Sequence, residues 1–367
     1  MEDVAVSSSN WSGMSVFLTG HTGFKGSWLA LMLSRAGAKV HGYSLAPPTT
    51  PNLYSVAGLA DHLASHTVAD IRDSKALRRA LSAAKPDIVF HLAAQSLVRQ
   101  SYAEPDETFE VNALGTVKLL EALRDCSSVR AIVNVTTDKC YRNSGDGRAF
   151  CETDPLGGDD LYSASKACSE LITAAYRNSF LARQGIAVAS ARAGNVIGGG
   201  DWAVDRLLPD VLRASDAGRP VAVRNPQSTR PWQHVLDPLS GYLALGQRLL
   251  EGVRDASLAP WSDAWNFGPN TADARPVAWL LDHLATCLPG LSWQQQAGQQ
   301  PHEAPQLRLD STKACTLLGW QPRWRLPDAL DRTVEWHQAW RRGDSMLDVC
   351  MAQIAAHEAS TQPTSAA

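Results

Sequence analysis

The sequence lacks a surplus of basic residues, since its 34 lysines and arginines face 37 aspartates and glutamates and leave a formal net charge of −3. Proteins whose main ligand is nucleic acid usually carry excess positive charge on one face. The composition therefore argues against nucleic acid as a partner.

Long apolar runs are also missing. The chain has no window of 18 consecutive apolar residues, and its polar, serine-rich start lacks the apolar core of a signal peptide. We therefore expect a cytoplasmic protein without a membrane partner.

Cysteine spacing excludes the common metal and redox motifs. The seven cysteines include no CxxC pair and none of the paired spacings of zinc fingers. An odd number of cysteines is typical of reduced thiols in a reducing compartment. We expect reduced thiols and no structural metal.

Length and local pattern indicate an α/β protein. The 367 residues suffice for one large α/β domain or two smaller ones. Short apolar runs typical of buried strands lie at residues 15–19, 39–45, 87–95 and 131–135.

A glycine-rich turn joins the first of these strands to a helical pattern. The turn is the GHTGFKG motif at residues 20–26, and the helical pattern runs from Ser27 to about Gly37. Glycines there permit a tight turn and close approach of the backbone to a pyrophosphate, and the helix N-terminus offers free N–H groups. The motif predicts a dinucleotide site, with a plain glycine-rich turn as the alternative.

The second predicted strand lacks the acidic residue that usually holds the ribose of NAD. Ser44 stands near its end, and no arginine of the kind that marks NADP sites replaces the acid. At this strand the choice between NAD and NADP is therefore open.

Two segments carry candidate catalytic side chains. Tyr162 and Lys166 are four residues apart in a stretch of helix formers, so they share one helical face. A nearby ammonium favours the phenolate of a tyrosine, which can then accept a proton from an alcohol. Thr137, Asp138 and Lys139 follow the strand at residues 131–135, where ligands of open parallel sheets bind. A Tyr–Lys pair at this spacing also occurs on ordinary helices, so the pair indicates catalysis only together with the other motifs of the chain.

Taken in order, the glycine turn, the Thr-Thr-Asp strand end and the Tyr-x-x-x-Lys helix resemble the extended short-chain dehydrogenase/reductase family over residues 14 to about 345. The resemblance implies an α/β fold, a Rossmann-type doubly wound parallel sheet with a smaller C-terminal substrate-binding domain, and NAD kept in one site through catalysis. Residues 69–73 resemble the loop beside the adenine, with a helix N-cap at Asp73 as the alternative. The implied cofactor contacts are Thr19, Gly20, Gly23, Phe24, Gly26, Asp70, Ile71, Leu92, Ala93, Ala94, Gln95, Tyr162 and Lys166.

Four segments resemble, within this family, the nucleotide-sugar 4,6-dehydratases and among them those that act on CDP-glucose. They are residues 20–28, 136–141, 154–158 and 230–234. Related dehydratases carry Thr-Asp-Glu where this chain has Thr137, Asp138 and Lys139. The cytosine base is indicated by the resemblance alone.

Arginines in the second half of the chain suit a pyrophosphate, because the planar guanidinium donates two hydrogen bonds to phosphate oxygens. Surface ion pairs are the alternative for Arg206 and Arg230, and a surface role is the alternative for Arg308. The candidate substrate contacts are Ser96, Asn195, Arg206, Arg230 and Arg308.

The resemblance also implies the order of the chemistry. Tyr162, polarised by Lys166 and aided by Thr137, would take the proton of the sugar 4-hydroxyl while hydride passes from C4 to NAD. Asp138, with a raised pKa, would then act as the acid at the C6 oxygen and Lys139 as the base at C5, before hydride returns to C6. Stabilising the enolate is the other role open to Lys139.

The predicted domains follow the family pattern. Residues 14–190 form the NAD-binding domain, to which 229–252 return, and residues 191–228 and 253–348 form the nucleotide-sugar-binding domain. We expect a disordered tail at 1–13 and a loose tail at 349–367. The helices at 107–125 and 161–183 are candidates for the interface of a homodimer or higher homo-oligomer.

Two other functions fit part of the pattern. A nucleotide-sugar 4-epimerase shares the turn, the threonine and the Tyr–Lys pair, but it has no use for Asp138 and Lys139. A non-catalytic nicotinamide-binding sensor keeps the fold, but such proteins usually lose the tyrosine or the lysine, and here both stand.

Overall fold

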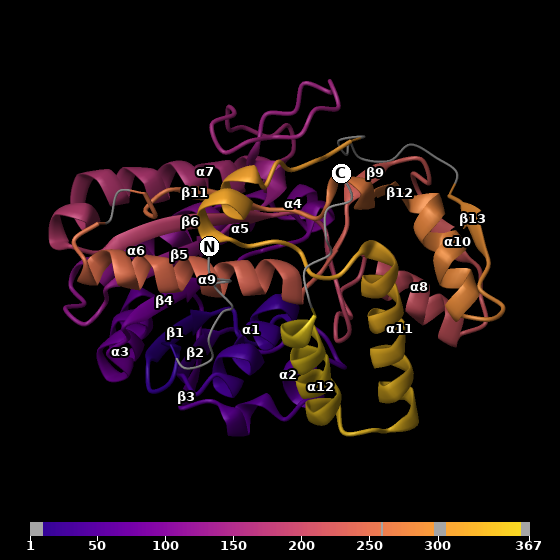
Figure 1. Ribbon diagram of the computed structural model, residues 1–367, viewed down its shortest axis with the longest axis horizontal. Helices are drawn as coiled ribbons and strands as arrows, with labels where there is room; N and C mark the ends of the chain where they lie inside the picture. Colours follow the sequence, from indigo (N-terminus) through magenta and orange to yellow (C-terminus); the bar gives the residue numbers. More distant parts are fainter. Residues whose placement is uncertain (1–9, 258–259, 297–305, 361–367) are drawn as a thin grey trace.

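A seven-stranded parallel β-sheet forms the centre of the protein, whose computed structural model describes residues 10–257, 260–296 and 306–360 (Figure 1). The strands follow the order β11-β6-β5-β4-β1-β2-β3, and every neighbouring pair runs parallel. They are β1 (Ser15–Thr19), β2 (Lys39–Ser44), β3 (Ser65–Val68), β4 (Ile88–His91), β5 (Ala131–Val135), β6 (Ala187–Ala193) and β11 (Ala264–Phe267). This is the Rossmann-type sheet expected from the sequence.

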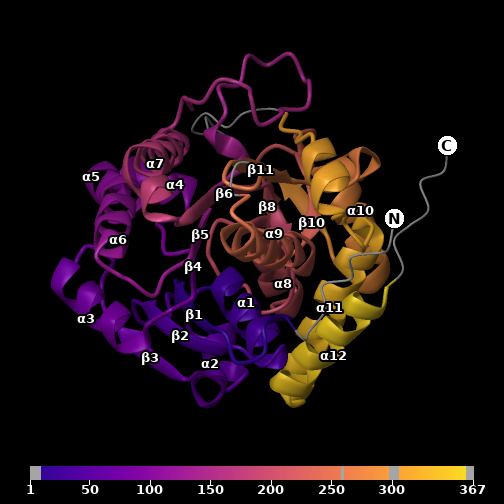
Figure 2. The same cartoon turned by 60° about the vertical axis from the view of Figure 1, so that its left-hand side comes forward.

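Apolar side chains on both faces of the sheet form two cores. In β1, Val16 and Leu18 belong to one core and Phe17 to the other, because successive side chains of a strand point to opposite faces. Helices α1 (Phe24–Arg35) and α9 (Leu236–Arg254) contribute to the first core, together with the last helices of the chain. Helices α3 (Ser74–Ala84), α6 (Gly115–Arg124) and α7 (Leu161–Tyr176) pack in the second (Figure 2).

Short helices join the strands near their carboxyl ends. They are α2 (Leu53–Val56), α4 (Val98–Ala103) and α5 (Pro105–Phe109). A π-helical segment, Glu110–Leu114, connects α5 to α6. None of the helices within the described ranges combines the length and the apolar character needed to cross a membrane.

A smaller domain packs beside the sheet around a third core, to which Leu208, Leu280, Leu284 and Leu330 contribute. Its elements are α8 (Leu207–Asp216), β8 (Val221–Val223), α10 (Val277–Cys287), β13 (Trp293–Gln295) and α11 (Leu326–Arg342). The accompanying two-stranded pairs are β8 with β13, β9 (Thr229–Pro231) with β12 (Ala274–Pro276), and β7 (Val196–Ile197) with β10 (Gln233–His234).

One predicted domain assignment is wrong. The expected smaller domain includes residues 253–348, but β11 lies within that range and is the edge strand of the large sheet, paired with β6. Trp265 and Phe267 of β11 are fully buried in the first core. The sequence of such a short strand does not show which sheet it joins, because the strand that it pairs with lies about 75 residues earlier in the chain.

Both predicted tails are partly wrong as well. Residues 1–9 and 361–367 lie outside the described residues, but Trp11 is fully buried, with its ring centroid 5.9 Å from that of Phe90. Residues 346–359 form α12 (Met346–Ala359), and its Cys350 and Ile354 belong to the first core. Their spacing of four residues places both on one helical face, which explains why this segment folds.

Candidate active site

A cavity of about 1490 Å³ lies at the carboxyl ends of the sheet strands and reaches the smaller domain. Gly20 follows β1, Leu92 follows β4 and Thr136 follows β5, and all three line it. Its volume exceeds the ~300–1,000 Å³ of a typical small-molecule pocket, so it has room for two ligands side by side.

The glycine turn forms one wall through backbone packing that leaves no room for a side chain. A Cβ on Gly20 would lie 2.8 Å from the nitrogen of Ala93, and one on Gly26 would lie 2.0 Å from the carbonyl oxygen of Gly20. Gly23 is the N-cap of α1 and supplies no side-chain cap. The first turn of α1 therefore keeps N–H groups for an anionic ligand, as expected for a dinucleotide turn.

Twelve of the thirteen predicted cofactor residues line this cavity, and Thr19 lies behind its wall. The Thr19 hydroxyl oxygen is fully buried, accepts from the nitrogens of Leu92 and Ala93 at 3.1 Å each, and lies 2.7 Å from Nδ1 of His91. Thr19 thus holds the loop after β4 in place, and its direct contact with the cofactor stays a prediction. The twelve lining residues are Gly20, Gly23, Phe24, Gly26, Asp70, Ile71, Leu92, Ala93, Ala94, Gln95, Tyr162 and Lys166.

The end of β2 is polar without being acidic. The hydroxyl oxygens of Ser44 and Thr22 lie 2.8 Å apart, and that of Thr22 also donates to the carbonyl of Leu45 at 2.9 Å. Further along the cavity, the hydrogen bonds from Arg72 lower the pKa of the Asp70 carboxyl. A carboxylate is thus present in the cavity wall, one strand away from its usual place.

Residues 69–73 combine a stretch of cavity wall with the predicted helix N-cap, and the position of the adenine beside them stays a prediction. Asp70 lines the cavity, and the Asp73 carboxylate accepts from the nitrogens of Lys75 and Ala76 at 3.0 Å each as the N-cap of α3. The loop after β3 therefore provides a cap and a cavity wall within four residues.

Asn112 fixes the loop after β4 to the helix that carries the tyrosine. Its side chain accepts from the nitrogen of Gln95 at 2.9 Å, donates to the carbonyl of Gln95 at 3.0 Å, and donates to Ser165 at 2.9 Å. Sequence reasoning missed this role. The signal was a polar residue on the apolar face of an amphipathic helix, where an unpaired amide would be costly.

Tyr162 and Lys166 lie at the start of α7, where the Asp160 carboxylate caps the helix by accepting from the nitrogen of Ser163 at 2.9 Å. Burial raises the pKa of Tyr162 to about 12, and a hydrogen bond with Thr137 opposes that rise. Burial also lowers the pKa of Lys166 to about 8, with Glu170 opposing. Burial is the main cause of both shifts, because it disfavours the charged form of each group.

Lys166 instead binds the strand below it. Its Nζ donates to the carbonyl of Val135 at 3.3 Å, at the end of β5. This contact ties α7 to the strand that precedes Thr137, so the phenol and the threonine hydroxyl meet from two different elements.

Asp138 is fully buried beside the cavity. Its Oδ1 accepts from Thr137 at 3.1 Å and from Nζ of Lys139 at 3.4 Å, whereas its Oδ2 is buried without a hydrogen-bond partner among the described residues. Lys139 lines the cavity, and its Nζ also donates to Oδ1 of Asn195 at 3.3 Å. An unpaired buried carboxyl oxygen is costly, which is typical of a group that serves a ligand.

A buried ion pair between Arg192 and Glu170 joins the elements that carry these candidate catalytic residues. Nη2 of Arg192 donates to Glu170 at 2.8 Å, and Glu170 also accepts from Ser190 at 2.6 Å and from Thr136. Nη1 of Arg192 donates to the phenol oxygen of Tyr141 at 2.7 Å. The network joins α7, β6 and the end of β5, so the elements that carry the candidate catalytic residues are held in register.

Comparison with known proteins agrees with this geometry. Residues 17–252 match the family model described as GDP-mannose 4,6 dehydratase, which is more than half of the chain. The chain belongs to this GDP-mannose 4,6 dehydratase family.

Relatives within and around the family cover nearly the whole chain. A CDP-glucose 4,6-dehydratase of Salmonella typhimurium is 48% identical over 358 residues, covering 96% of this chain and 98% of the relative. A dTDP-glucose 4,6-dehydratase of Xanthomonas campestris pv. campestris is 27% identical, covering 89% and 94%.

Solved structures share the fold. The epimerase Mth375 of Methanothermobacter thermautotrophicus superimposes with a TM-score of 0.76 at 23% identity, covering 93% of this chain and 98% of its own. A dTDP-glucose 4,6-dehydratase of Bacillus anthracis, solved in complex with NAD, gives a TM-score of 0.73 at 22% identity, covering 91% and 100%. The predicted fold class is confirmed.

In this GDP-mannose 4,6 dehydratase family member, four of the five predicted substrate residues line the cavity. Arg206 donates to Asp201 at 2.9 Å and to the Ser96 hydroxyl at 3.0 Å, which brings the smaller domain against the loop after β4. Asn195 and Arg230 also line the cavity. Arg308 is exposed and is not among the residues that line the cavity, so its substrate contact and its alternative surface role both stay predictions.

Sequence reasoning missed several basic residues of the cavity. Lys25 lies in the glycine turn, and burial together with the charge of Arg206 lowers its pKa to about 7. Lys25 lies inside the GHTGFKG motif, and this position could have identified it as a cavity residue. Four further arginines come from loops and helices that only the tertiary fold brings together: Arg99, Arg213, Arg219 and Arg224.

Proposed function

We propose that the protein is an NAD-dependent CDP-glucose 4,6-dehydratase, which converts CDP-glucose into CDP-4-keto-6-deoxyglucose and water. The observation that carries this proposal is that Tyr162, Thr137 and Lys139 line one cavity. Asp138 is buried behind them and accepts from both Thr137 and Lys139. The near-full-length likeness to the Salmonella CDP-glucose 4,6-dehydratase supports the choice of substrate.

The cavity wall fits a dinucleotide. The turn at Gly20 and Gly26 has no space for a Cβ, and α1 begins without a side-chain cap, so backbone N–H groups can approach a pyrophosphate. Asp70 and Ile71 would hold the adenosine end, and the loop at Leu92 to Gln95 would cover the middle. When bound, NAD supplies a reversible hydride acceptor that begins and ends the cycle in the same oxidation state.

Tyr162 accepts the proton of the sugar 4-hydroxyl in this proposal. Its hydrogen bond with Thr137 gives the proton a defined path, and Lys166 places a cationic group one helical turn away. To accept that proton the phenol must already be ionised. Burial raises the pKa of Tyr162 to about 12, whereas the hydrogen bond with Thr137 and the charge of Arg206 lower it and so favour the phenolate.

Asp138 donates a proton to the leaving C6 oxygen. Its unpaired Oδ2 is the atom available for that contact, since Oδ1 is bound to Thr137 and Lys139. Burial keeps the group away from bulk water, and its bonds to Thr137 and Lys139 hold it beside the cavity.

Two lysines are candidates for the base that removes the proton from C5 of the sugar. Lys139 stays the predicted base because it lies beside Asp138 and lines the cavity. Lys25 is the second candidate, because burial and the charges of Arg206 and Lys166 lower its pKa to about 7, which leaves part of it neutral near neutral pH. If Lys25 is the base, Lys139 stabilises the enolate.

The substrate pyrophosphate would lie against the basic wall formed by Asn195, Arg206 and Arg230. Guanidinium groups bind phosphate oxygens through paired hydrogen bonds, and several of them offset the double negative charge. The cytosine base rests on the resemblance and on the relative's name.

Incubation with CDP-glucose and NAD tests the function. We expect the alkali-induced absorbance of a 4-keto-6-deoxy sugar to appear. A C4 epimer without that chromophore would instead support the 4-epimerase, and NAD binding without turnover would support the non-catalytic sensor. Either result would overturn the proposal.

A homodimer through the α6–α7 side is also proposed. Leu114, Leu171 and Phe180 are exposed large apolar residues within the helices at 107–125 and 161–183. Exposed apolar groups gathered on adjacent helices favour burial against a second copy. Leu171→Glu should shift the mass measured by light scattering from dimer to monomer, and a wild-type monomer would contradict the proposal. A cytoplasmic location stays a prediction.

A further inference from the structure

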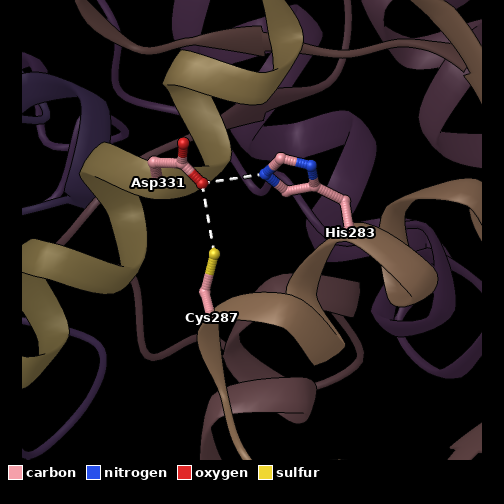
Figure 3. A group of neighbouring side chains, drawn as sticks. All are labelled: His283, Cys287 and Asp331. Atoms are coloured by element: carbon pink, nitrogen blue, oxygen red, sulfur yellow. Dashed lines mark hydrogen bonds and ion pairs between the residues drawn. The ribbon is translucent and has the colours of Figure 1, made fainter.

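His283, Cys287 and Asp331 form a compact cluster on the smaller domain, away from the cavity described above. His283 and Cys287 are one turn apart on α10, and Asp331 faces them from α11. Figure 3 shows the imidazole and the thiol directed at the same carboxylate oxygen of Asp331. Nε2 of His283 lies 2.8 Å from that oxygen, and Sγ of Cys287 lies 3.2 Å from it.

The three donor atoms have the spacing of a metal ligand set. They all lie within 4.8 Å of one another. Zinc binds imidazole nitrogen and carboxylate oxygen at about 2.0–2.2 Å and thiolate sulfur at about 2.3 Å, so a tetrahedral site separates its ligand atoms by about 3.3–3.8 Å. The two separations from Asp331, 2.8 and 3.2 Å, are slightly shorter than these values, so the groups reach that arrangement when the side chains move apart to admit the ion.

We propose that His283, Cys287 and Asp331 bind one Zn²⁺, or a similar divalent transition metal, with a water molecule as the fourth ligand. One imidazole, one thiolate and one carboxylate are a donor set that suits borderline-soft metals and not Mg²⁺ or Ca²⁺. The thiolate and the carboxylate together neutralise the charge of the ion. Because the Cys287 thiol now donates to Asp331, metal binding releases one proton.

The surroundings hold the ligands in place. The His283 ring stacks on Trp279, one turn earlier on α10, with centroids 5.6 Å apart and planes inclined by 19°. Beneath the cluster, Leu280 and Leu284 of α10 pack with Leu330 of α11 in the third core. The two helices are thus already aligned, so little order has to be created when the ion binds.

The ion would stabilise the smaller domain and would take no part in the chemical reaction. The start of α10 is attached to the cavity wall, since the nitrogen of Val277 donates to the carbonyl of Ser228 at 3.1 Å, and both residues line the cavity. Binding at the other end of α10 would stabilise that wall by mass action on the folded form.

The competing explanation is a metal-independent pair of hydrogen bonds. His283 and Asp331 form an ion pair when the imidazole is protonated, and the thiol adds a weak hydrogen bond. A partly exposed pair of this kind contributes little to stability. It predicts no uptake of metal by the intact protein.

Cobalt substitution distinguishes the two. The full-length protein, stripped of metal with a chelator, is titrated with Co²⁺ while its absorbance is recorded, and Zn²⁺ is then added in competition. We expect one Co²⁺ per chain, a thiolate-to-cobalt charge-transfer band, d–d bands of tetrahedral intensity, and loss of both sets of bands when Zn²⁺ is added. Absence of the charge-transfer band in the wild-type protein would overturn the proposal.

Single variants assign the ligands. Cys287→Ser should abolish the charge-transfer band, and His283→Gln and Asp331→Asn should each weaken Co²⁺ binding at least about 100-fold, because even indirect ligand contacts change affinity about 10–100-fold. Cys315→Ser, which changes another partly buried free cysteine, is the matched control and should leave the spectrum unchanged. A band that survives Cys287→Ser, or that disappears in Cys315→Ser, would also overturn the assignment.

Stability and activity provide independent readouts. Zn²⁺ should raise the thermal midpoint of the wild-type protein and leave that of Cys287→Ser unchanged, while dehydratase activity stays the same in both. A midpoint that rises equally in the two proteins would show that the ion binds elsewhere.

Discussion

Oδ1 of Asp138 and Nζ of Lys139 lie 3.4 Å apart, although the two side chains belong to consecutive residues. The carboxylate is fully buried, whereas the lysine side chain keeps 24% of its exposed surface and reaches the cavity. A single turn after β5 therefore sets a buried acid directly behind an amine that lines the cavity. Water elimination requires both groups at neighbouring carbons.

Asp138→Asn should leave C4 oxidation intact and stop water loss. The amide keeps the shape of the side chain but has no proton to give to the C6 oxygen, so we expect the elimination rate to fall by about 10²–10⁴. The absorbance of enzyme-bound NADH should then persist after CDP-glucose is added. Water loss at the parental rate would show that another group is the acid.

Tyr162→Phe should abolish hydride transfer, because no group would remain to accept the 4-hydroxyl proton, and a loss of about 10²–10⁴ is expected. The measurement is the formation of NADH in a single turnover. Tyr176→Phe is the control on the same helix, since its hydroxyl contacts Glu121 and lies outside the cavity lining. Equal losses in both variants would indicate damage to α7 instead of lost chemistry.

Lys139→Met and Lys25→Met separate the two candidate bases. Each removes a charge while keeping the length of the side chain, and the incorporation of solvent deuterium at C5 of the product is measured by NMR. We expect Lys139→Met to slow this exchange by about 10²–10⁴ and Lys25→Met to slow it far less. The reverse pattern would make Lys25 the base and Lys139 the group that stabilises the enolate.

Gly26→Ala should distort the glycine turn that forms the predicted dinucleotide-binding wall of the cavity. The new methyl group would lie 2.0 Å from the carbonyl oxygen of Gly20, which is backbone and has no other position to take. At Gly23 the same change meets that oxygen at 3.4 Å with an ordinary φ of −79°. We expect calorimetric titration to show NAD binding lost in Gly26→Ala and largely kept in Gly23→Ala, and equal affinities would contradict the packing argument.

Stability should fall as the pH drops from about 6.5 towards 4. Burial lowers the pKa of His21 to about 4 and that of His91 to about 3, both from 6.5. The unfolded chain then binds protons that the folded chain excludes, which stabilises the unfolded state below pH 6.5. At pH 5 each histidine should account for about 2 kcal/mol of lost unfolding free energy.

Urea unfolding at pH 7.5 and pH 5 measures this loss. The variant His91→Gln should show a smaller difference between the two pH values than the wild-type protein. A wild-type stability that is equal at both pH values would contradict the prediction.

The sequence by itself determined the elements whose causes are local. The GHTGFKG turn, the apolar strand ahead of it and the helix that bears Tyr162 follow from glycine geometry, apolar runs and an Asp160 cap, all within a few residues. Their order along the chain was enough to indicate the family and the cavity at the strand ends.

Tertiary structure alone decided whatever depends on partners far apart in the chain. It placed β11 in the large sheet, buried Trp11, folded residues 346–359 onto the core and left Arg308 outside the cavity. It also brought Lys25 beside Arg206 and set Asp331 against His283 and Cys287. Strand pairing, burial and electrostatic coupling act through space between distant segments, whereas a sequence pattern reports only on neighbours along the chain.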